Sequence, residues 1–384
     1  MATDELTRDE FLRYSRHLLI PEIGLAGQKK LKRSSALILG TGGLGSPVSM
    51  YLAAAGVGHI GIVDYDVVDE SNLQRQIVHG QAAIGMLKVE SAKNRLLDIN
   101  PHIKVTAFNE PFTSANAMRI ARGFDIIVDC TDNFPTRYLS NDVAVILGIP
   151  NVYGSIYRFD GQVSVFGMPD GPCYRCVFPE PPPPGLVPTC SDGGVLGVLP
   201  GIIGSLQANE AIKVLLGIGE IASGKLLLLD ALSFSFDTVT IRKNPNCKVC
   251  GTNPEIIELI DYDQFCGVPG FDHQPSVERE FVISPVQLKN ELASIRPPLL
   301  IDVREPHELE ISNIEGAINI PLHDIFVERE HIPRDHPVVL FCKRGSRSVM
   351  ALNILLKAGF SNIRHLDGGI NRWVEQFDQS QPVY

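Results

Sequence analysis

Residues 35–64 read SALILGTGGLGSPVSMYLAAAGVGHIGIVD, and this stretch decides the fold class of the first part of the chain. The apolar run at 35–40 ends in glycine and predicts a short buried strand. The glycine-rich turn that follows leads into a helix of small residues, and HIGIVD at 59–64 predicts the next strand. A strand, a tight turn, a helix and a second strand together form a unit of a parallel sheet.

The same alternation of strand and helix continues to about residue 150. Helical spacing and apolar runs predict two helices, at 88–99 and 136–147, and two strands, at 104–109 and 125–130. Beyond residue 150 the pattern changes, because 161–167 and 233–236 alternate apolar with polar residues, as antiparallel strands do. We therefore expect an α/β fold, a Rossmann-like doubly wound sheet with appended antiparallel strands.

A second series of strands and helices occupies residues 281–384, which is long enough for an independent domain. Two strands and a helix are predicted there, at 298–303, 337–342 and 346–358. Residues 253–280 have mixed polarity and no clear period, so they predict a linker. The expected organisation is a first domain over 1–252, this linker, and a separate small α/β domain over 281–384.

Composition excludes some classes of partner. The chain has 384 residues and a formal net charge of −10, which disfavours duplex nucleic acid or an anionic membrane as the main partner. No apolar run approaches the ~18 residues that a membrane span needs. The first residues, MATDELTRDEF, are charged and do not resemble a signal peptide. We expect a soluble cytoplasmic protein.

The glycine-rich turn carries the first candidate site. Residues 40–45 fit the pattern G-x-G-x-x-G, and Asp64 ends the next strand 19 residues after Gly45. Such glycines admit a phosphate to the helix N-terminus, and such an acid binds a ribose hydroxyl. A tight turn without a ligand would explain the glycines alone. The turn itself does not distinguish NAD from ATP.

Three charged residues near the same sheet edge favour ATP. Arg75 follows the second strand, Lys88 begins the predicted helix at 88–99, and Asp132 follows the strand DIIVDC. Taken singly, they could be a surface charge, a solvated helix residue and a helix N-cap. Together they offer two cations for a polyphosphate and a carboxylate for Mg²⁺, which hydride transfer does not need.

Four of the eight cysteines form two C-x-x-C pairs that are separated by 70 residues: Cys173, Cys176, Cys247 and Cys250. Four thiolates can bind Zn²⁺ tetrahedrally, and a site whose four positions are all filled by protein is structural. Two unrelated thiol pairs would also fit the spacing.

Two other cysteines are candidates for covalent chemistry. Cys342 closes the apolar strand VVLFC and precedes the predicted helix, with Lys343, Arg344 and Arg347 nearby. A helix N-terminus and three cations favour the thiolate, although a cysteine at a strand end can simply be buried. Cys190 follows a proline-rich loop, and such a loop can carry a thiol to an activated carbonyl.

Seven motifs carry a resemblance; in chain order they read RYSRH, GTGGLGSP, YLAAAGVG, DYDVVDESNLQRQ, CTDN, PCYRC and CSDGGVLG. With them, residues 1–250 resemble the MoeB/ThiF-type adenylyltransferases, relatives of the ubiquitin-activating enzymes. The resemblance implies an enzyme that binds ATP and Mg²⁺. It also implies a partner, a ubiquitin-like sulfur carrier protein with a C-terminal Gly-Gly, whose terminal carboxylate is adenylated.

The resemblance assigns the ATP site to ten positions: Gly43, Asp64, Ser71, Asn72, Leu73, Gln74, Arg75, Lys88, Asp132 and Asn133. Asp132 would hold Mg²⁺. Arg16 matches an arginine that the family inserts into the partner subunit's site, so it implies a homodimer. Without the resemblance, Arg16 would be a solvated residue of the amphipathic helix that a capping box beginning at Thr7 predicts over 8–20.

The C-terminal part resembles the rhodanese family. The loop C-x4-R from Cys342 to Arg347 is accompanied by LLIDVREPHELE, IEGAINIPL and HLDGGINRW. In that family the loop cysteine carries sulfur as a persulfide. Phosphatases of related fold have one residue more before the arginine, so the spacing favours a persulfide over a phosphoenzyme. The adenylyltransferase family also carries the four-cysteine zinc, and in some members the cysteine at position 190 forms an adduct with the carrier.

The chain is therefore expected to be a fused adenylyltransferase and sulfurtransferase, fed by a sulfur donor such as a cysteine desulfurase or thiosulfate. Two alternatives stay open at this point: an NAD-dependent oxidoreductase with a regulatory rhodanese module, and a non-catalytic scaffold of a sulfur relay. The motifs do not choose among a carrier of molybdenum cofactor biosynthesis, of thiamine synthesis, or of cysteine or tRNA thiolation.

Overall fold

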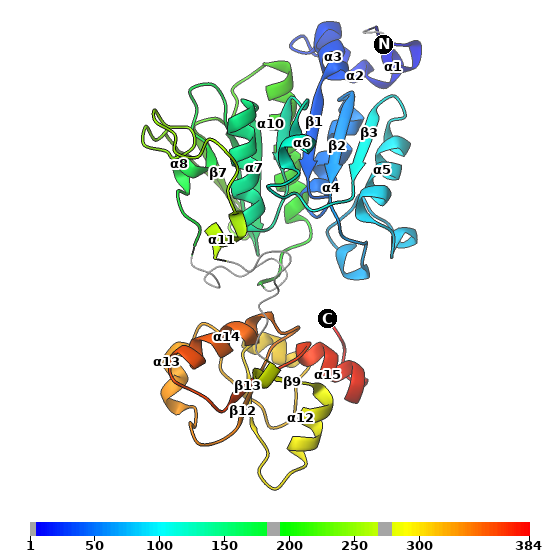
Figure 1. Cartoon of the computed structure of the whole chain (residues 1–384). Helices are drawn as coiled ribbons and strands as arrows, with labels where there is room; N and C mark the ends of the chain where they lie inside the picture. The colour runs from blue at the N-terminus through cyan, green and yellow to red at the C-terminus, as the bar shows by residue number, and fades with distance from the viewer. Residues whose placement is uncertain (1–4, 183–192, 268–278) are drawn as a thin grey trace. The chain divides into compact units, whose positions relative to one another are not determined.

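The computed structural model describes residues 5–182, 193–267 and 279–384. The chain divides into two compact units, Met1–Val268 and Pro269–Tyr384, each of which has its own sheet (Figure 1). In the described part of the chain, no helix is both long and apolar enough to cross a membrane.

The first unit contains a mixed sheet of eight strands in the order β3-β2-β1-β4-β5-β6-β7-β8. The first five are parallel, and β6 to β8 are added antiparallel, as the change of pattern after residue 150 predicts. The strands are β1 (Ser35–Leu39), β2 (His59–Val63), β3 (Lys104–Phe108), β4 (Ile126–Asp129), β5 (Asn151–Tyr157), β6 (Asp160–Phe166), β7 (Lys225–Asp230) and β8 (Ser235–Thr240). Every residue of β1 is buried, because a parallel strand is covered on both faces.

Helices cover both faces of this sheet, with one apolar cluster on each face. One face packs against α3 (Gly24–Arg33), α4 (Gly45–Ala55), α5 (Lys88–Ile99) and α10 (Leu199–Leu216). The other packs against α6 (Ala117–Ala121), α7 (Phe134–Leu147), α8 (Tyr174–Val177) and α11 (Tyr262–Cys266). Because β1 has β2 on one side and β4 on the other, the strand order reverses at β1, which is where open α/β sheets bind ligands.

The helix predicted over 8–20 is two short helices, α1 (Arg8–Arg13) and α2 (Ser15–Leu18). Tyr14 interrupts them because it is buried and its hydroxyl accepts a hydrogen bond from Asn100 at 2.8 Å. The strand predicted at 233–236 begins later, as β8. Residues 231–234 instead form the turn after β7, which the Asp230 carboxylate stabilises by accepting from the main-chain N–H of Leu232 at 2.8 Å.

The first unit extends into the predicted linker, as far as Val268. Residues 261–267 contain α11, which belongs to the first unit and packs against α7. The Tyr262 hydroxyl donates to the buried Asp142 carboxylate at 2.8 Å, and the Asp142 carboxylate also forms an ion pair with Arg175 at 2.8 Å. The Tyr262–Asp142 hydrogen bond joins residues 120 positions apart, and no local period reveals it.

The second unit has a parallel sheet in the order β11-β10-β12-β13-β9, as a separate small α/β domain requires. Its strands are β9 (Val282–Ile283), β10 (Leu299–Asp302), β11 (Ile318–Asn319), β12 (Val338–Phe341) and β13 (Ile363–Leu366). The helices α13 (Ile325–Glu328) and α14 (Ser346–Lys357) cover one face, and α12 (Pro285–Leu292) and α15 (Gly369–Phe377) cover the other. The carboxyl end of β12 therefore leads directly into the loop that carries Cys342.

Candidate functional site

The glycine loop joins β1 to α4 at the reversal point of the sheet. A Cβ on Gly45 would lie 1.9 Å from the Gly40 carbonyl oxygen, so the close approach of helix and strand requires glycine there. The carboxylate of Asp64, at the end of β2, accepts from both the N–H and the hydroxyl of Thr41, at 2.8 and 2.9 Å. The predicted ribose-binding acid therefore also fixes the position of the loop.

The segment after β2 returns to this loop. Asp69 caps the short 3-10 helix η1 (Glu70–Asn72), which contains Ser71 and Asn72. Leu73, Gln74 and Arg75 follow it directly. A Cβ on Gly43 would lie 3.8 Å from the Arg75 side chain. The buried His79 contacts the Thr41 carbonyl at 3.1 Å, so its Nε2 carries the proton and donates. Sequence reasoning missed His79, since no motif distinguishes it from a core histidine.

Lys88 is buried at the start of α5, where its side chain is only 8% exposed. Its Nζ forms an ion pair with Asp66 at 2.8 Å, and its N–H donates to the Asp66 carbonyl at 2.9 Å. Burial, and after it the charges of the Asp66, Asp132 and Asp64 carboxylates, raise the pKa of Tyr65 to about 12. Three carboxylates therefore act on Tyr65, and one of them, that of Asp66, is already paired with Lys88.

The residues after β4 complete this edge. The Asp132 carboxylate is exposed and forms no hydrogen bond with any residue that the structure describes. Asn133, rather than Asp132, is the N-cap of α7, since its side-chain oxygen accepts from the N–H of Thr136 at 2.9 Å. Asp132 is therefore available to a metal ion, and the structure gives Asn133 a structural role at the position predicted to bind ATP.

The other two predicted residues of the first domain are Arg16 and Cys190. Arg16 is exposed on α2, as a residue that serves a partner subunit would be. Cys190 lies outside the described residues.

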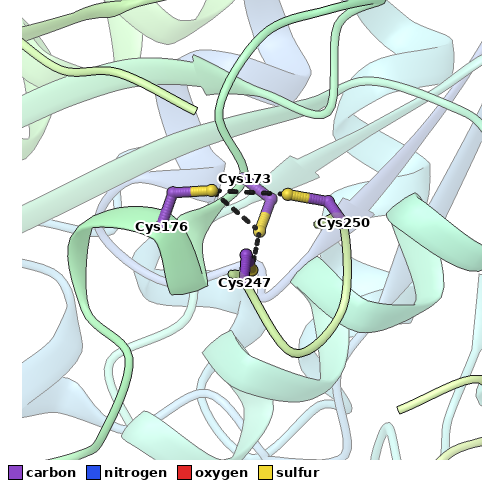
Figure 2. A group of neighbouring side chains, drawn as sticks. All are labelled: Cys173, Cys176, Cys247 and Cys250. Atoms are coloured by element: carbon purple, nitrogen blue, oxygen red, sulfur yellow. Dashed lines mark hydrogen bonds between the residues drawn. The ribbon is translucent and has the colours of Figure 1, made fainter. Parts of the chain in front are cut away.

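The two C-x-x-C pairs meet in one cluster, from α8 and its N-cap on one side and from the turn after β8 on the other (Figure 2). The sulfur of Cys173 lies 3.5 Å from that of Cys247, and the sulfur of Cys176 lies 3.3 Å from that of Cys250. All four sulfurs are within 4.8 Å of one another. Tetrahedral ligands at a Zn–S distance of about 2.3 Å are about 3.8 Å apart, so the cluster is compatible with zinc.

The chemistry of the donor set agrees with this fit. Hydrogen bonds among the four thiols lower the pKa of Cys247 and Cys176 and raise the pKa of Cys173 and Cys250, so two members of the cluster ionise more readily than separate thiols do. Zinc binds thiolates, and its binding then displaces the remaining protons. The alternative of two unrelated thiol pairs is excluded by their proximity.

Replacing Cys247 by alanine is expected to lower the zinc content and the melting temperature together. Four-thiolate binding energy is also folding energy, and the variant leaves three ligands in a partly buried site. Zinc per chain is measured by elemental analysis and unfolding by calorimetry. Cys266→Ala is the matched control, because Cys266 is also buried but lies outside the cluster. Full zinc occupancy in Cys247→Ala would exclude the four-cysteine site.

In the second unit, Cys342 lies between β12 and α14 and is fully buried. The N–H of Gly345 donates to its Sγ at 3.1 Å, and the Ser348 hydroxyl lies 3.7 Å away. Such an N–H stabilises negative charge on sulfur. Because Cys342 is enclosed, a sulfur donor reaches the sulfur only when side chains of the loop move.

The N-terminus of α15 supports the loop from outside. The N–H groups of Ile370 and Asn371 donate to the carbonyls of Cys342 and Lys343, at 2.8 and 3.1 Å. A Cβ on Gly369 would lie 2.3 Å from the Cys342 carbonyl oxygen, so this approach requires glycine. The contact explains the sequence DGGI within the third rhodanese-like motif.

The prediction that three cations stabilise the Cys342 thiolate needs correction. Arg347 forms a buried two-bond ion pair with Glu308, at 2.6 and 2.8 Å. Lys343 lies over the ring of Tyr384, 4.5 Å from its centroid. Although burial opposes ionisation, the hydrogen bonds from Arg347 lower the pKa of Glu308 to about 2, so the pair stays charged. Arg344 alone of the three is exposed.

The first unit has the glycine-rich loop of nucleotide-binding α/β folds, and the second unit has a loop that encloses a cysteine. Together they define a class of enzymes with two functional domains. Residues 14–249 match the ThiF family and residues 284–376 match the rhodanese-like domain. The chain belongs to the ThiF family, with a rhodanese-like domain C-terminal to it.

Curated relatives share both parts. The chain is 49% identical to a protein of Mycobacterium tuberculosis named probable adenylyltransferase/sulfurtransferase MoeZ, over 99% of this chain and 96% of the relative. It is 44% identical to the adenylyltransferase and sulfurtransferase MOCS3 of Drosophila yakuba, over 99% of this chain and 86% of the relative.

Solved structures agree with the fold of the first unit. Escherichia coli MccB in complex with succinimide has a TM-score of 0.56 and 23% identity, covering 65% of this chain and 76% of that one. The same protein solved with ATP has a TM-score of 0.53 and 20% identity, covering 64% and 83%. These similarities support the Rossmann-like fold.

Proposed function

We propose that this chain adenylates the C-terminal glycine of a ubiquitin-like sulfur carrier protein and then converts it to a thiocarboxylate with sulfur from a persulfide on Cys342. The enzyme class itself, an adenylyltransferase and sulfurtransferase, follows from the family of both parts. The observation that carries the proposal is the pairing in one chain of a loop suited to ATP with an enclosed cysteine suited to sulfur. An oxidoreductase would need no persulfide loop.

In the first unit, ATP is the substrate that activates the carrier. The helix N-terminus after Gly43 accepts the phosphates, Asp64 binds the ribose, and Arg75 and Lys88 face the polyphosphate. To bind ATP, the Lys88 ammonium group must leave the Asp66 carboxylate and contact a phosphate oxygen. A cation next to Asp66 would make this exchange easier. Mg²⁺ held by Asp132 would supply charge neutralisation for the departing pyrophosphate.

The other ATP-site assignments also belong to this proposal: Ser71, Asn72, Leu73, Gln74 and Asn133. Arg16, exposed on α2, would complete the site of a second copy in a homodimer. Zn²⁺ on the four cysteines would hold the turn after β8 to α8 and take no part in the reaction.

The reaction then proceeds on the carrier's carboxylate. Attack of this carboxylate on ATP forms the acyl-adenylate and releases pyrophosphate. A donor such as a cysteine desulfurase or thiosulfate places a sulfur on Cys342. The terminal persulfide sulfur attacks the acyl carbon and AMP leaves, which gives an acyl disulfide. A thiol, which we assign to Cys190, attacks the Cys342 sulfur and releases the thiocarboxylate, so that a Cys190–Cys342 disulfide is left for a cellular reductant.

The test is incubation with each class of carrier, ATP, Mg²⁺ and thiosulfate, followed by intact mass. The expected product is a carrier whose C-terminus has exchanged one oxygen for sulfur, a gain of about 16 Da, and only with ATP present. Pyrophosphate exchange into ATP that depends on the carrier separates the proposal from an oxidoreductase. A carrier that binds but never turns over would indicate a scaffold instead.

A further inference from the structure

The residues after α15 return to the Cys342 loop. Gln381 forms two hydrogen bonds with the main chain of Asn313: it accepts from the N–H at 2.7 Å and donates to the carbonyl at 2.9 Å. The main-chain oxygen of Tyr384 accepts from the Asn371 side chain at 2.8 Å. These contacts hold residues 381–384 in place within the second unit and position the Tyr384 side chain next to the Cys342 loop.

The Tyr384 hydroxyl is fully engaged. It accepts from Arg304 at 2.8 Å and donates to Glu308 at 2.9 Å. Arg304 is itself buried and ion-paired with Asp302 at 2.6 Å, so the hydroxyl lies against a rigid group. Burial raises the pKa of Tyr384 to about 12, and the phenol therefore keeps the proton that it donates.

Two routes lead from Tyr384 to the loop. The same Glu308 oxygen that accepts from Tyr384 also accepts from Arg347, at 2.8 Å, and Arg347 is the last residue of the C-x4-R loop. The ring lies beneath Lys343, the residue that follows Cys342. One side chain thus contacts the loop at its second residue directly and at its last residue through one carboxylate.

We propose that Tyr384 is a positioning residue for sulfur transfer, which holds the Cys342 loop closed around the sulfur through Lys343 and through the Glu308–Arg347 ion pair. The inference rests on the proposed role of Cys342. Nothing in the adenylation site depends on it. The ring and the hydroxyl act separately: phenylalanine keeps the cation–π contact and loses the hydrogen bonds, whereas leucine loses both.

The direct test is the rate at which iodoacetamide alkylates Cys342 in the full chain, read by peptide mass. Because the thiol is enclosed, alkylation reports loop opening. We expect the rate to rise about threefold in Tyr384→Phe and about tenfold in Tyr384→Leu. The matched control is Phe326→Leu, because Phe326 is an exposed ring 4.1 Å from the Arg329 guanidinium, on α13. Its rate is expected to equal that of the wild type.

The second readout is transfer of sulfur from thiosulfate to cyanide. The Cys342 thiolate attacks the outer sulfur of thiosulfate, and sulfite leaves with the electron pair of the broken S–S bond. Cyanide then takes this sulfur as thiocyanate and restores the thiolate. We expect kcat to fall in both variants, less in Tyr384→Phe than in Tyr384→Leu. The KM for thiosulfate should change less than about twofold, because the loop positions the sulfur and does not bind the donor.

Unchanged alkylation and unchanged kcat in a folded Tyr384→Leu would overturn the inference, and so would a raised KM with normal kcat. If Tyr384→Leu unfolds at the assay temperature, Tyr384→Phe is the deciding variant. A wild-type alkylation rate of Cys342 in Tyr384→Phe would then overturn the inference. Sulfur transfer that persists in Cys342→Ala would overturn the proposed function instead, and the alkylation series would still report on Tyr384.

Discussion

Replacing Asp132 by alanine is expected to lower the rate of carrier-dependent pyrophosphate exchange into ATP by at least about 100-fold. Sulfur transfer from thiosulfate should continue at the wild-type rate. The carboxylate is exposed and acts on Tyr65, at the edge where the phosphates are proposed to bind. Sulfurtransfer is unaffected because Cys342 lies in the other compact unit. Isotope exchange and thiocyanate formation measure the two activities on the same preparation.

Two variants sharpen this experiment. Asp98→Ala removes an exposed carboxylate from α5, which pairs with the neighbouring Arg95, and should leave both activities unchanged. Asp132→Asn keeps the shape of the side chain but not its charge, and should resemble Asp132→Ala. If Asp132→Ala lost both activities while remaining folded, the assignment of the two reactions to separate units would be wrong. Normal exchange would remove Asp132 from the metal site.

Features that depend on local spacing could be predicted from the sequence. The glycine loop, the two C-x-x-C pairs and the C-x4-R loop each follow from residues close in the chain, and the change to antiparallel strands follows from a change of period. The carboxyl ends of parallel strands lie at one edge of the sheet, so Asp64 after β2 and Asp132 after β4 are at the same edge.

Features that depend on a distant partner could not be predicted. Tyr14 breaks the first helix because of Asn100, and α11 forms in a stretch without period because Tyr262 bonds to Asp142. A single buried hydrogen bond outweighs weak local propensity in both cases.

The same limit applies to the charges of the sites. The sequence favours Lys88 as a cation for a polyphosphate, yet in the structure Lys88 forms an ion pair with Asp66. Arg347 was counted as a cation for Cys342, yet Glu308, 39 positions earlier, takes both of its hydrogen bonds. A sequence shows which charges are near each other along the chain, but their effect depends on the counter-charges that folding adds.

Replacing Cys342 by alanine is expected to have the opposite effect to the Asp132 variant. Pyrophosphate exchange should stay near the wild-type rate, because adenylation needs no thiol. Persulfide formation from thiosulfate should disappear, and the yield of thiocarboxylate should fall to what free sulfide supplies directly. Intact mass of the enzyme shows the persulfide as a gain of about 32 Da, which the alanine variant should lack.

Cys190→Ala separates the two reactive cysteines. It should keep both exchange and persulfide loading, since neither involves the thiol proposed to resolve the acyl disulfide. After the persulfide has attacked the acyl-adenylate, some thiol must cleave the S–S bond. Without Cys190 the carrier should remain attached to Cys342, as an adduct on a non-reducing gel that dithiothreitol releases.

The outcomes discriminate between steps of the mechanism. Full turnover without an adduct in Cys190→Ala would leave an external reductant as the resolving agent and remove Cys190 from the reaction. Loss of pyrophosphate exchange in Cys342→Ala would be more serious, because it would link the cysteine loop to adenylation, which the separate cores of the two units argue against. The double variant should behave as Cys342→Ala does: without a persulfide no acyl disulfide forms, so there is nothing for Cys190 to resolve.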